Sequence, residues 1–112
     1  MNPIKLAKLA FKSLASFVSG WAMNSIAVLS NHGLMPVWLG GYSDHVWVLD
    51  GRHQAMMASH HFKILCDIIA IPQWGMIASF GDVLLVCGVT GGFIVFAIGL
   101  ATYLTERFLP RL

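Results

Sequence analysis

Two long stretches without charged side chains limit what this chain of 112 residues can fold into. Ser13 to Ser43 holds no Asp, Glu, Lys or Arg over 31 residues, and Val83 to Thr105 holds none over 23. A helix of about 20 apolar residues crosses a bilayer core about 30 Å thick. We therefore predict an all-α membrane protein with two transmembrane helices, at about residues 9–31 and 82–105.

The composition agrees with this class and excludes others. Hydrophobic residues make up 57% of the chain and charged residues only 11%, whereas a soluble domain carries about 25% charged residues. The formal net charge is +2, and the basic residues form no stripe interleaved with aromatic residues. Nucleic acid is therefore excluded as a partner, and we expect a single membrane domain, residues 1–112, in contact with the lipid bilayer.

The first apolar stretch also has the pattern of a secretory signal peptide. Lys5, Lys8 and Lys12 form a basic region, an apolar run follows, and "SIA" at residues 25–27 has the small residues of a cleavage site. Because the chain retains Met1, we interpret this stretch as an uncleaved signal anchor.

The positions of the basic residues predict the orientation. Lys5, Lys8 and Lys12 precede the first helix, and Arg107 and Arg111 follow the second. Because Lys and Arg collect on the cytoplasmic side, we expect a multi-pass protein of a bacterial inner membrane, with both termini and the tail 106–112 in the cytoplasm. The loop 32–81 then faces outward. It holds all the histidines of the chain: His32, His45, His53, His60 and His61.

The outward loop is predicted to contain a helix at the membrane surface. Residues 51–70 carry apolar and polar side chains at helical spacing, and Pro72 would end this interfacial helix. Ser79 and Asp82 have the spacing of a helix N-cap, from which the second transmembrane helix would start. The aromatic residues of the loop that favour a membrane interface are Trp38, Tyr42, Trp47 and Trp74.

A turn is expected where the first helix ends, in "NHGLMPV" at residues 31–37. Asn31 can cap the end of the helix, and Gly33 can adopt a backbone angle that other residues resist. Pro36, after Met35, prevents the helix from continuing. His32 is then an interface residue. Alternatively, His32 ligates a haem or a chlorophyll-type ring, although the absence of histidine within either predicted helix argues against such a site.

Three blocks of the chain, "SNHGLMPV", "LCDIIAIP" and "SFGDVLLVCG", resemble an uncharacterised family of small bacterial integral membrane proteins. That family has Asn-x-Gly-x-Met-Pro-Val, Leu-x-Asp and Ser-x-Gly-Asp-Val blocks in this order. Its additional amino-terminal helices have no counterpart here, and His32 stands where a glycine is expected. The resemblance implies a membrane architecture and no particular activity. Its signature positions are Asn31, Gly33, Met35, Pro36, Asp67, Pro72, Ser79, Gly81 and Asp82.

Small residues at four-residue spacing predict close helix packing. Ser16 and Gly20 lie in the first predicted helix, and Gly88 and Gly92 lie in the second. This spacing lets helix backbones approach each other, so the two helices would pack together or against another membrane protein. Asn24 is the one strong hydrogen-bonding side chain inside the first helix, and we expect it to bond across helices.

A metal site is the main chemical alternative. His53 and His60 are seven residues apart, with Met57 between them and Asp67 two turns further on, and such ligands suit a soft or borderline metal. No Cys-x-x-Cys or His-Glu-x-x-His motif accompanies them. The competing interpretation is that these histidines contact lipid headgroups or a neighbouring subunit.

Catalysis has no positive signal in the sequence. No arrangement typical of a nucleophile and its base is present. Asp67 can pair with Lys63, and Asp82 can cap a helix. Cys66 and Cys87 are expected to be two free, buried thiols. We therefore expect the protein not to be an enzyme.

Three functions remain open. The leading hypothesis is a non-catalytic accessory or assembly subunit that packs against other integral membrane subunits of a larger bacterial complex, through small-residue helix faces and an aromatic, histidine-rich loop. In that case we expect no cofactor bound by this chain alone. The alternatives are a module that binds a metal, haem or pigment through the loop histidines, and a holin-like pore that assembles from copies of itself.

Overall fold

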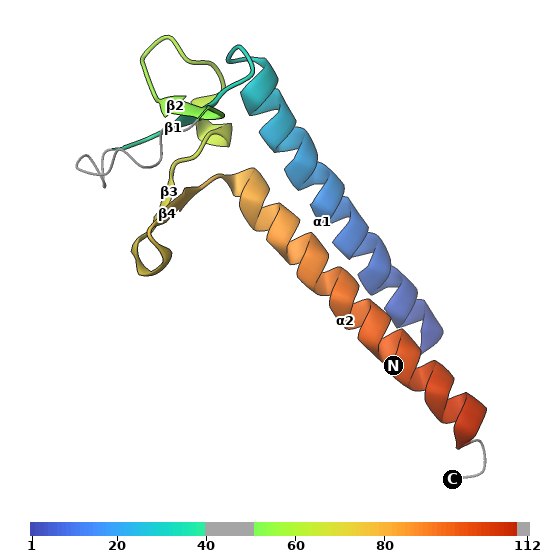
Figure 1. Cartoon of the computed structure of the whole chain (residues 1–112). Helices are drawn as coiled ribbons and strands as arrows, with labels where there is room; N and C mark the ends of the chain where they lie inside the picture. The colour runs from blue at the N-terminus through green and yellow to red at the C-terminus, as the bar shows by residue number, and fades with distance from the viewer. Residues whose placement is uncertain (40–50, 110–112) are drawn as a thin grey trace.

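The computed structural model describes residues 1–39 and 51–109, and in it two long helices lie side by side (Figure 1). The predicted roles of Tyr42, His45, Trp47 and Arg111 fall outside the described residues. The elements, in chain order, are α1 (Pro3–Leu29), β1 (Met35–Val37), β2 (His53–Ala55), the 3-10 turn η2 (Lys63–Leu65), β3 (Ile69–Ile71), the 3-10 turn η3 (Pro72–Trp74), β4 (Met76–Ala78) and α2 (Phe80–Phe108).

Both helices are long and apolar enough to cross a membrane. α1 has 27 residues and α2 has 29, so at about 1.5 Å per residue each is roughly 40 Å long. Each helix extends beyond the predicted ranges 9–31 and 82–105 at one or both ends, because hydropathy marks only the apolar part of a helix. Backbone hydrogen bonding continues until a cap is reached, and Asn2 and Ser79 provide the two N-caps.

The two helices run antiparallel and approach each other closely. Gly20 of α1 lies against the backbone of Gly81 and Leu85, and a Cβ atom built on Gly20 would lie 2.5 Å from the Gly81 carbonyl oxygen. Further along the pair, Gly88 of α2 lies against Phe17, where a built Cβ would lie 2.7 Å from the Phe17 Cβ. Small residues on both helices are therefore required for this distance.

Polar side chains also join the two helices. The Ser16 hydroxyl donates a hydrogen bond to the Leu84 carbonyl at 2.7 Å, so Ser16 lies in the contact as expected. Gly91 also lies in the contact, against the Ser13 side chain. Gly92 does not, because nothing lies within 4 Å of a Cβ built there. Of the two expectations for Gly92, close packing against the first helix is therefore not observed, and packing against another membrane protein stays a prediction.

The segment between the helices contains short strands and turns. β1 pairs in parallel with β2, with Met35 opposite His53, and β3 pairs antiparallel with β4, with Ile69 opposite Ala78. η3 connects β3 to β4, and Gly75 ends it with a positive φ of 59°. The predicted interfacial helix at 51–70 is wrong: the chain there forms β2, η2 and the start of β3.

The physical reason for this difference is pairing between distant segments. The helical spacing of the apolar residues in 51–70 is a local signal, whereas the main chain of this segment bonds to β1. The Met35 amide donates to the Arg52 carbonyl at 2.9 Å, and the Met56 amide donates to the Val37 carbonyl at 2.8 Å. Non-local strand pairing overrides a local helical pattern.

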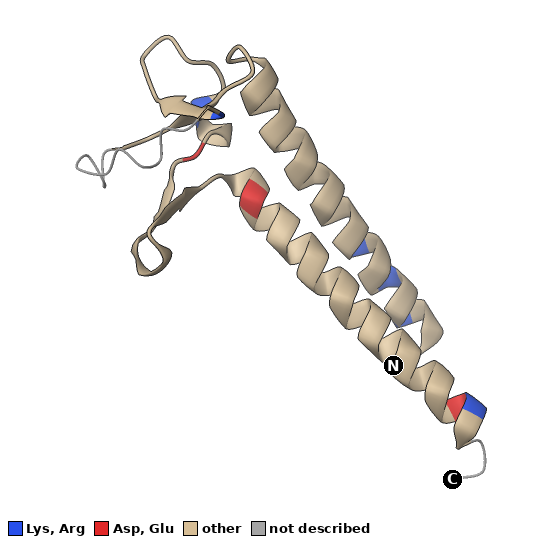
Figure 2. Ribbon diagram, viewed as in Figure 1, with Lys and Arg blue, Asp and Glu red and all other residues tan. Residues whose placement is uncertain are grey.

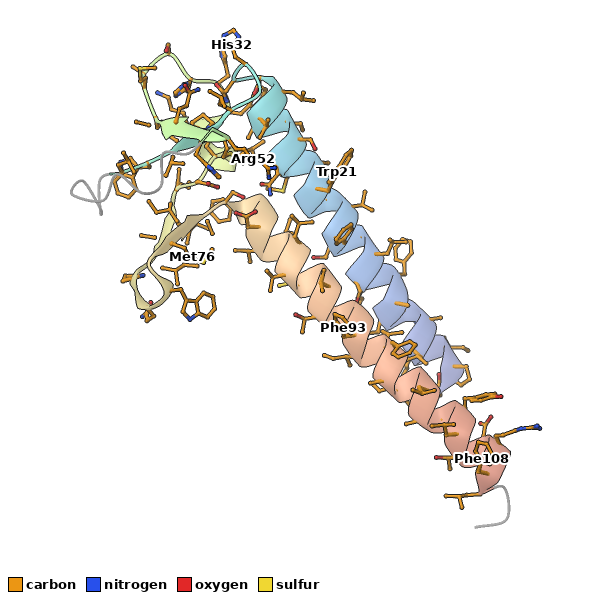
Figure 3. The ribbon with its side chains drawn as sticks, in the orientation of Figure 1. Trp21, His32, Arg52, Met76, Phe93 and Phe108 are labelled. Atoms are coloured by element: carbon orange, nitrogen blue, oxygen red, sulfur yellow. The ribbon has the colours of Figure 1, made fainter. Side chains whose placement is uncertain are left out.

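A small core lies where the strands meet the end of α1. Ala27, Met35 and Cys66 pack together and are buried. Along the helices, in contrast, large apolar side chains are exposed, and Figure 3 shows Trp21 and Phe93 projecting away from the helix pair. The described part of the molecule is elongated, with extents of 64 × 27 × 19 Å, and only its strand-bearing end has a packed interior.

Candidate functional site

A cleft of about 460 Å³ opens between the end of α1, the start of α2 and the strands. Its polar walls come from both helices and from the connecting segment: Asn24, Arg52, His53, Asp67 and Asp82. Met35 and Val28 add an apolar wall. Apart from Lys63 of η2, the other described charged groups lie toward the opposite half of the helix pair, as Figure 2 shows for the lysines of α1. This cleft is therefore the candidate site.

Asn24 connects the two helices at the cleft. Its amide nitrogen donates to Asp82 Oδ1 at 2.8 Å, and its amide oxygen accepts from the Ser79 hydroxyl at 2.6 Å. Ser79 and Asp82 also form a reciprocal capping box at the start of α2: the Asp82 amide donates to Ser79 Oγ and the Ser79 amide donates to Asp82 Oδ2, each at 3.0 Å. Asn24 thus makes the predicted bond across helices, and Ser79 and Asp82 form the predicted cap.

Gly81 makes room for this cluster. A Cβ atom on Gly81 would collide with the Asn24 amide and with the Gly20 carbonyl oxygen, which would lie 2.7 Å away. The side chain at this position must therefore be a hydrogen atom. Gly81 belongs to the third of the sequence blocks, "SFGDVLLVCG", together with Ser79 and Asp82, and all three positions serve the same helix start.

Asp67 faces the cleft from the segment between η2 and β3, and its main chain is held firmly. The Asp67 amide donates to the Pro36 carbonyl at 3.1 Å, and the Trp38 amide donates to the Asp67 carbonyl at 2.9 Å. These two bonds join Asp67 to β1 as an isolated parallel bridge opposite Val37. The predicted pairing of Asp67 with Lys63 depended on a helix that is not formed here.

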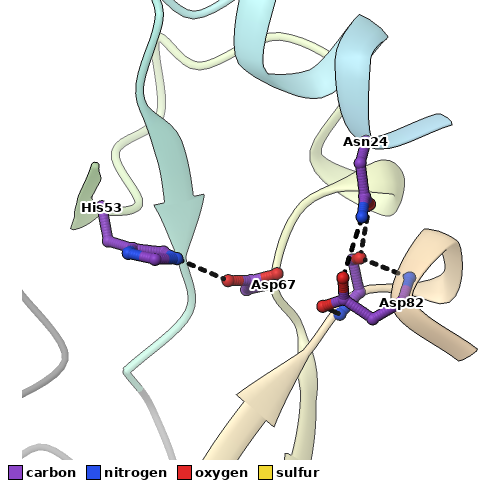
Figure 4. A network of polar contacts seen from close by, with 5 residues as sticks. Asn24, His53, Asp67 and Asp82 are labelled. Carbon is purple, nitrogen blue, oxygen red and sulfur yellow. Dashed lines mark hydrogen bonds and ion pairs between the residues drawn. The ribbon is translucent and has the colours of Figure 1, made fainter. Parts of the chain in front are cut away.

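The Asp67 carboxyl is 5% exposed, and its two oxygens have different surroundings. Oδ2 lies 3.6 Å from His53 Nε2. Oδ1 is buried, and no hydrogen-bond donor reaches it from the residues that the structure describes. Burial, and then the nearby Asp82 carboxylate, raise the pKa of Asp67 to about 7, and His53 opposes this rise. Figure 4 shows the carboxyl between His53 and the cluster of Asn24 and Asp82.

Asn31 fixes the segment around residue 61 to the end of α1. Its amide nitrogen donates to the Ala27 carbonyl at 2.7 Å and to the His61 carbonyl at 2.9 Å, and its amide oxygen accepts from the His61 amide at 2.8 Å. Asn31 is 1% exposed, so these bonds are made away from solvent. Asn31 therefore caps the helix as predicted and also holds the loop.

The turn after Asn31 has two consecutive residues with positive φ, His32 at 60° and Gly33 at 84°. Gly33 thus has the backbone angle that the sequence predicts. Met35 and Pro36 follow in β1, where both are buried. His32 is exposed at the tip of the molecule beyond α1 (Figure 3), and it takes no part in the cleft.

The three residues of the predicted metal site, His53, His60 and Met57, have different contacts. His53 faces Asp67. The His60 ring accepts from the Met57 amide through Nδ1 at 2.8 Å, and its Nε2 lies 2.9 Å from the Gln54 side-chain nitrogen. The Met57 side chain is exposed. Within residues 1–39 and 51–109, no group of three His, Cys, Asp or Glu side chains gathers in a way that could hold a metal.

Both cysteines are free, but only Cys66 is buried, and Cys87 is exposed on α2. The Cys66 thiol donates to the Phe62 carbonyl at 3.4 Å. Burial, and then the Asp67 carboxylate, raise the pKa of Cys66. A thiol with a raised pKa is a poor nucleophile, so Cys66 serves the packing of the core.

Sequence reasoning missed the meeting of His53, Asp67 and the Asn24 cluster in one cleft. One signal was present, because Asp67 stands within the apolar run "ILCDIIAI". A carboxylate inside such a run is either paired or shifted in pKa. His53 could not be assigned to it, since the parallel pairing of β1 with β2 that brings His53 there has no local signature in the sequence.

Comparison with known proteins identifies a family. A model described as "Family of unknown function (DUF5317)" matches residues 3–96. No curated protein and no solved structure matches the chain. The matched range contains α1, the strands and every residue named above as lining the cleft.

Proposed function

The chain belongs to this family of unknown function, and we propose that it is a non-catalytic accessory or assembly subunit of a larger membrane protein complex. In this proposal α1 and α2 cross a bacterial inner membrane, and the strands lie outside with the cleft. The subunit contacts lipid on most of its helix surface and other integral membrane subunits on part of it. It carries no cofactor of its own.

The distribution of apolar side chains supports the membrane placement. In a soluble protein the most apolar helix is the most buried, whereas α2 exposes Val86, Phe93 and Phe96. α1 begins in the half of the molecule in which α2 ends (Figure 1), so the lysines of α1 and Arg107 lie in the same half of the helix pair (Figure 2). That clustering favours a cytoplasmic position for both helix ends.

The main support for the proposal is a notch on α2, which is the open groove at Gly92. The contact between α1 and α2 includes four glycines: Gly20, Gly81, Gly88 and Gly91. Gly92, in contrast, faces open space in a groove of about 390 Å³. Val89, Phe93 and Phe96 line this groove. An apolar groove at a glycine on a lipid-facing helix suits the close approach of a further transmembrane helix.

The test is to fill the notch. We expect Gly92→Leu to leave the fold intact, because a Cβ atom there has no neighbour within 4 Å, but to abolish co-purification of partner subunits after mild detergent extraction from the native membrane. The matched control is Ala101→Leu, which adds a larger side chain at another exposed position of α2 outside the groove. Partners retained equally by both variants would refute the proposal.

The same preparation separates the alternatives. A holin-like pore would co-purify only copies of this chain and would release dye from liposomes, whereas an accessory subunit is present in fixed proportion to other proteins. A module that binds a metal, haem or pigment would show metal content or visible absorption that His53→Gln or His60→Gln removes. The Gly92 notch favours helix association over this last alternative, because none of its lining residues is a ligand for such a group.

A further inference from the structure

The lysines of α1 lie beside the interior of α2 and not beside its end. Ser13 of α1 lies against Gly91 of α2, and the Leu6 Cδ2 atom would lie 3.9 Å from a Cβ atom built on Gly99. Lys12 is next to Ser13 in the chain, so it is level with the middle of α2. Figure 2 shows the lysines of α1 beside α2, which continues beyond them.

The depth of Lys12 follows from the length of the uncharged stretch of α2. Gly91 is nine residues from Asp82 and fourteen from Thr105. At about 1.5 Å per residue, Gly91 lies roughly 14 Å from one end of this stretch and roughly 21 Å from the other. A lysine side chain, with its four-carbon stem, reaches about 6 Å. If α2 crosses the bilayer as proposed above, the Lys12 ammonium therefore stays within the hydrocarbon core.

A different depth of the helix pair in the bilayer does not remove this conflict. If the membrane surface lay at Lys12, a core of about 30 Å would extend about 20 residues toward the strand-bearing end of the molecule. It would then enclose the Asp82 carboxylate near its centre. Phe96 and Leu104, which are exposed on α2, would leave the lipid. That placement is less favourable, because it buries a carboxylate in the core and also exposes apolar side chains to water.

A charged side chain in a membrane core is nearly always paired or faces the interior of a helix bundle, and the two helices offer no partner at this depth. α1 contains neither Asp nor Glu, and the acidic residues of α2, Asp82 and Glu106, stand at the two ends of its uncharged stretch. The other acidic residue within residues 1–39 and 51–109, Asp67, lies in the cleft. A second copy of the chain in the same orientation has its carboxylates at the same depths, so it could not supply the partner either.

Lys12 lines an apolar groove on the face of α1 that points away from α2. The groove has a volume of about 370 Å³, and its lining residues are Ile4, Ala7, Lys8, Phe11 and Lys12. Because successive residues of a helix are about 100° apart, Lys8 and Phe11 lie on the other side of α1 from Ser13. Ile4 and Phe11 are 67% and 73% exposed, so the described part of the chain leaves this face open.

A phospholipid headgroup suits Lys5 better than Lys12. Lys5 is next to Leu6, which lies near Gly99, and Gly99 is six residues, or roughly 9 Å, from Thr105. A reach of about 6 Å brings the Lys5 ammonium close to the surface, where it can contact lipid phosphate. For Lys12 the distance to the same surface is roughly 21 Å. Only a group inside the membrane can therefore meet the Lys12 ammonium.

We propose that the groove of Ile4, Phe11 and Lys12 docks a transmembrane helix of another protein, which presents an Asp or Glu side chain to Lys12. The inference rests on the membrane placement and the accessory role proposed above, and it adds the chemistry of the partner. This contact is distinct from the groove at Gly92, which lies on α2 and has no charged lining residue. A desolvated ion pair gives the contact a specificity that apolar packing lacks.

The test places a photo-crosslinking residue at Ala7, which is exposed and lines the groove, in the full chain in its native membrane. We expect adducts with another membrane protein. Mass spectrometry of the crosslinked peptide should find a transmembrane segment that contains Asp or Glu. Adducts only with phospholipid, only with a second copy of this chain, or with a segment that has no carboxylate overturn the proposal.

Three substitutions assign the contact to the charge of Lys12, which is exposed in the chain itself. Lys12→Met keeps the length of the side chain but removes its charge, and we expect the yield of the protein adduct to fall at least about tenfold. Lys12→Arg retains the charge and should keep the partner. Lys5→Met is the matched control, because it removes the same charge from the same helix nearer to the surface, and it should crosslink as the wild type does. Equal yields from Lys12→Met and Lys5→Met overturn the proposal.

Co-purification after mild detergent extraction separates this inference from the accessory role. If partners of the wild type are lost from Gly92→Leu but retained by Lys12→Met, the accessory role stands and the inference fails. If Lys12→Met loses them and Gly92→Leu retains them, the inference stands and the notch is not the contact. If the wild type retains no partner and forms no protein adduct at residue 7, both proposals fail.

Discussion

At the scale of single residues, Asp67 is the group whose charge conflicts most with its surroundings. Its carboxyl is buried near the Asp82 carboxylate of α2, and His53 of β2 and Arg52 line the same cleft. Burial and Asp82 raise the pKa of Asp67 from an ordinary 3.8 to about 7. The folded protein therefore holds a proton on Asp67 more tightly than the unfolded chain does.

This shift predicts that the Asp67 contribution to stability is greatest below pH 3.8 and is lost as the pH rises through about 7. Each unit of pKa corresponds to about 1.4 kcal/mol, so the loss approaches about 4 kcal/mol by pH 8. Thermal unfolding in detergent at pH 5 and at pH 8 measures the part of this loss that falls between the two pH values, about 3 kcal/mol. Asp67→Asn should lose less stability than the wild type over this interval, whereas Glu106→Gln should behave as the wild type. An identical pH dependence in wild type and Asp67→Asn would contradict the shift.

At the scale of elements, the contact between α1 and α2 depends on which glycine faces which helix. A Cβ on Gly88 would lie 2.7 Å from the Phe17 backbone nitrogen, whereas a Cβ on Gly92 would meet nothing. Gly88→Ala should therefore destabilise the helix pair by about 1–3 kcal/mol, the usual cost of overpacking, and Gly92→Ala should not. Unfolding of both variants by increasing fractions of denaturing detergent measures this difference, and equal stability of the two would show that the close contact is not formed.

The same elements show what the sequence could predict. Both helices, the capping box of Ser79 and Asp82, and the bond made by Asn24 follow from local patterns of apolar, capping and polar residues. Gly92 has the four-residue spacing from Gly88 and Gly91 does not, yet Gly91 is the one that lies against Ser13, because the rotation of α2 against α1 decides which residue faces the contact. The strands at 53–55 and 69–71 have three residues each, too few to show a period of two. The cleft depends on those strands, so its composition could not be predicted.

At the scale of the whole molecule, the two ends of the helix pair differ in both charge and shape. The described part of the chain is 64 Å long, which exceeds a bilayer core of about 30 Å. The excess allows the strands to stand clear of the lipid at one end, with Trp38 and Trp74 exposed there. At the other end are Lys5, Lys8 and the last turn of α2. A hairpin with such ends has two possible orientations, and only the basic residues select between them.

We predict that the lysine end is cytoplasmic, and cysteine labelling tests this. The background is a chain whose Cys66 and Cys87 are replaced by alanine. In it, Ser59→Cys should react with a membrane-impermeant maleimide in intact cells, because Ser59 is exposed in the segment that connects α1 to α2. Lys5→Cys, also at an exposed position, should react only after the inner membrane is permeabilised. The two sites control for each other, since a chain outside the membrane would be labelled at both. Labelling of residue 5 alone in intact cells would reverse the orientation, and the cleft would then face the cytoplasm.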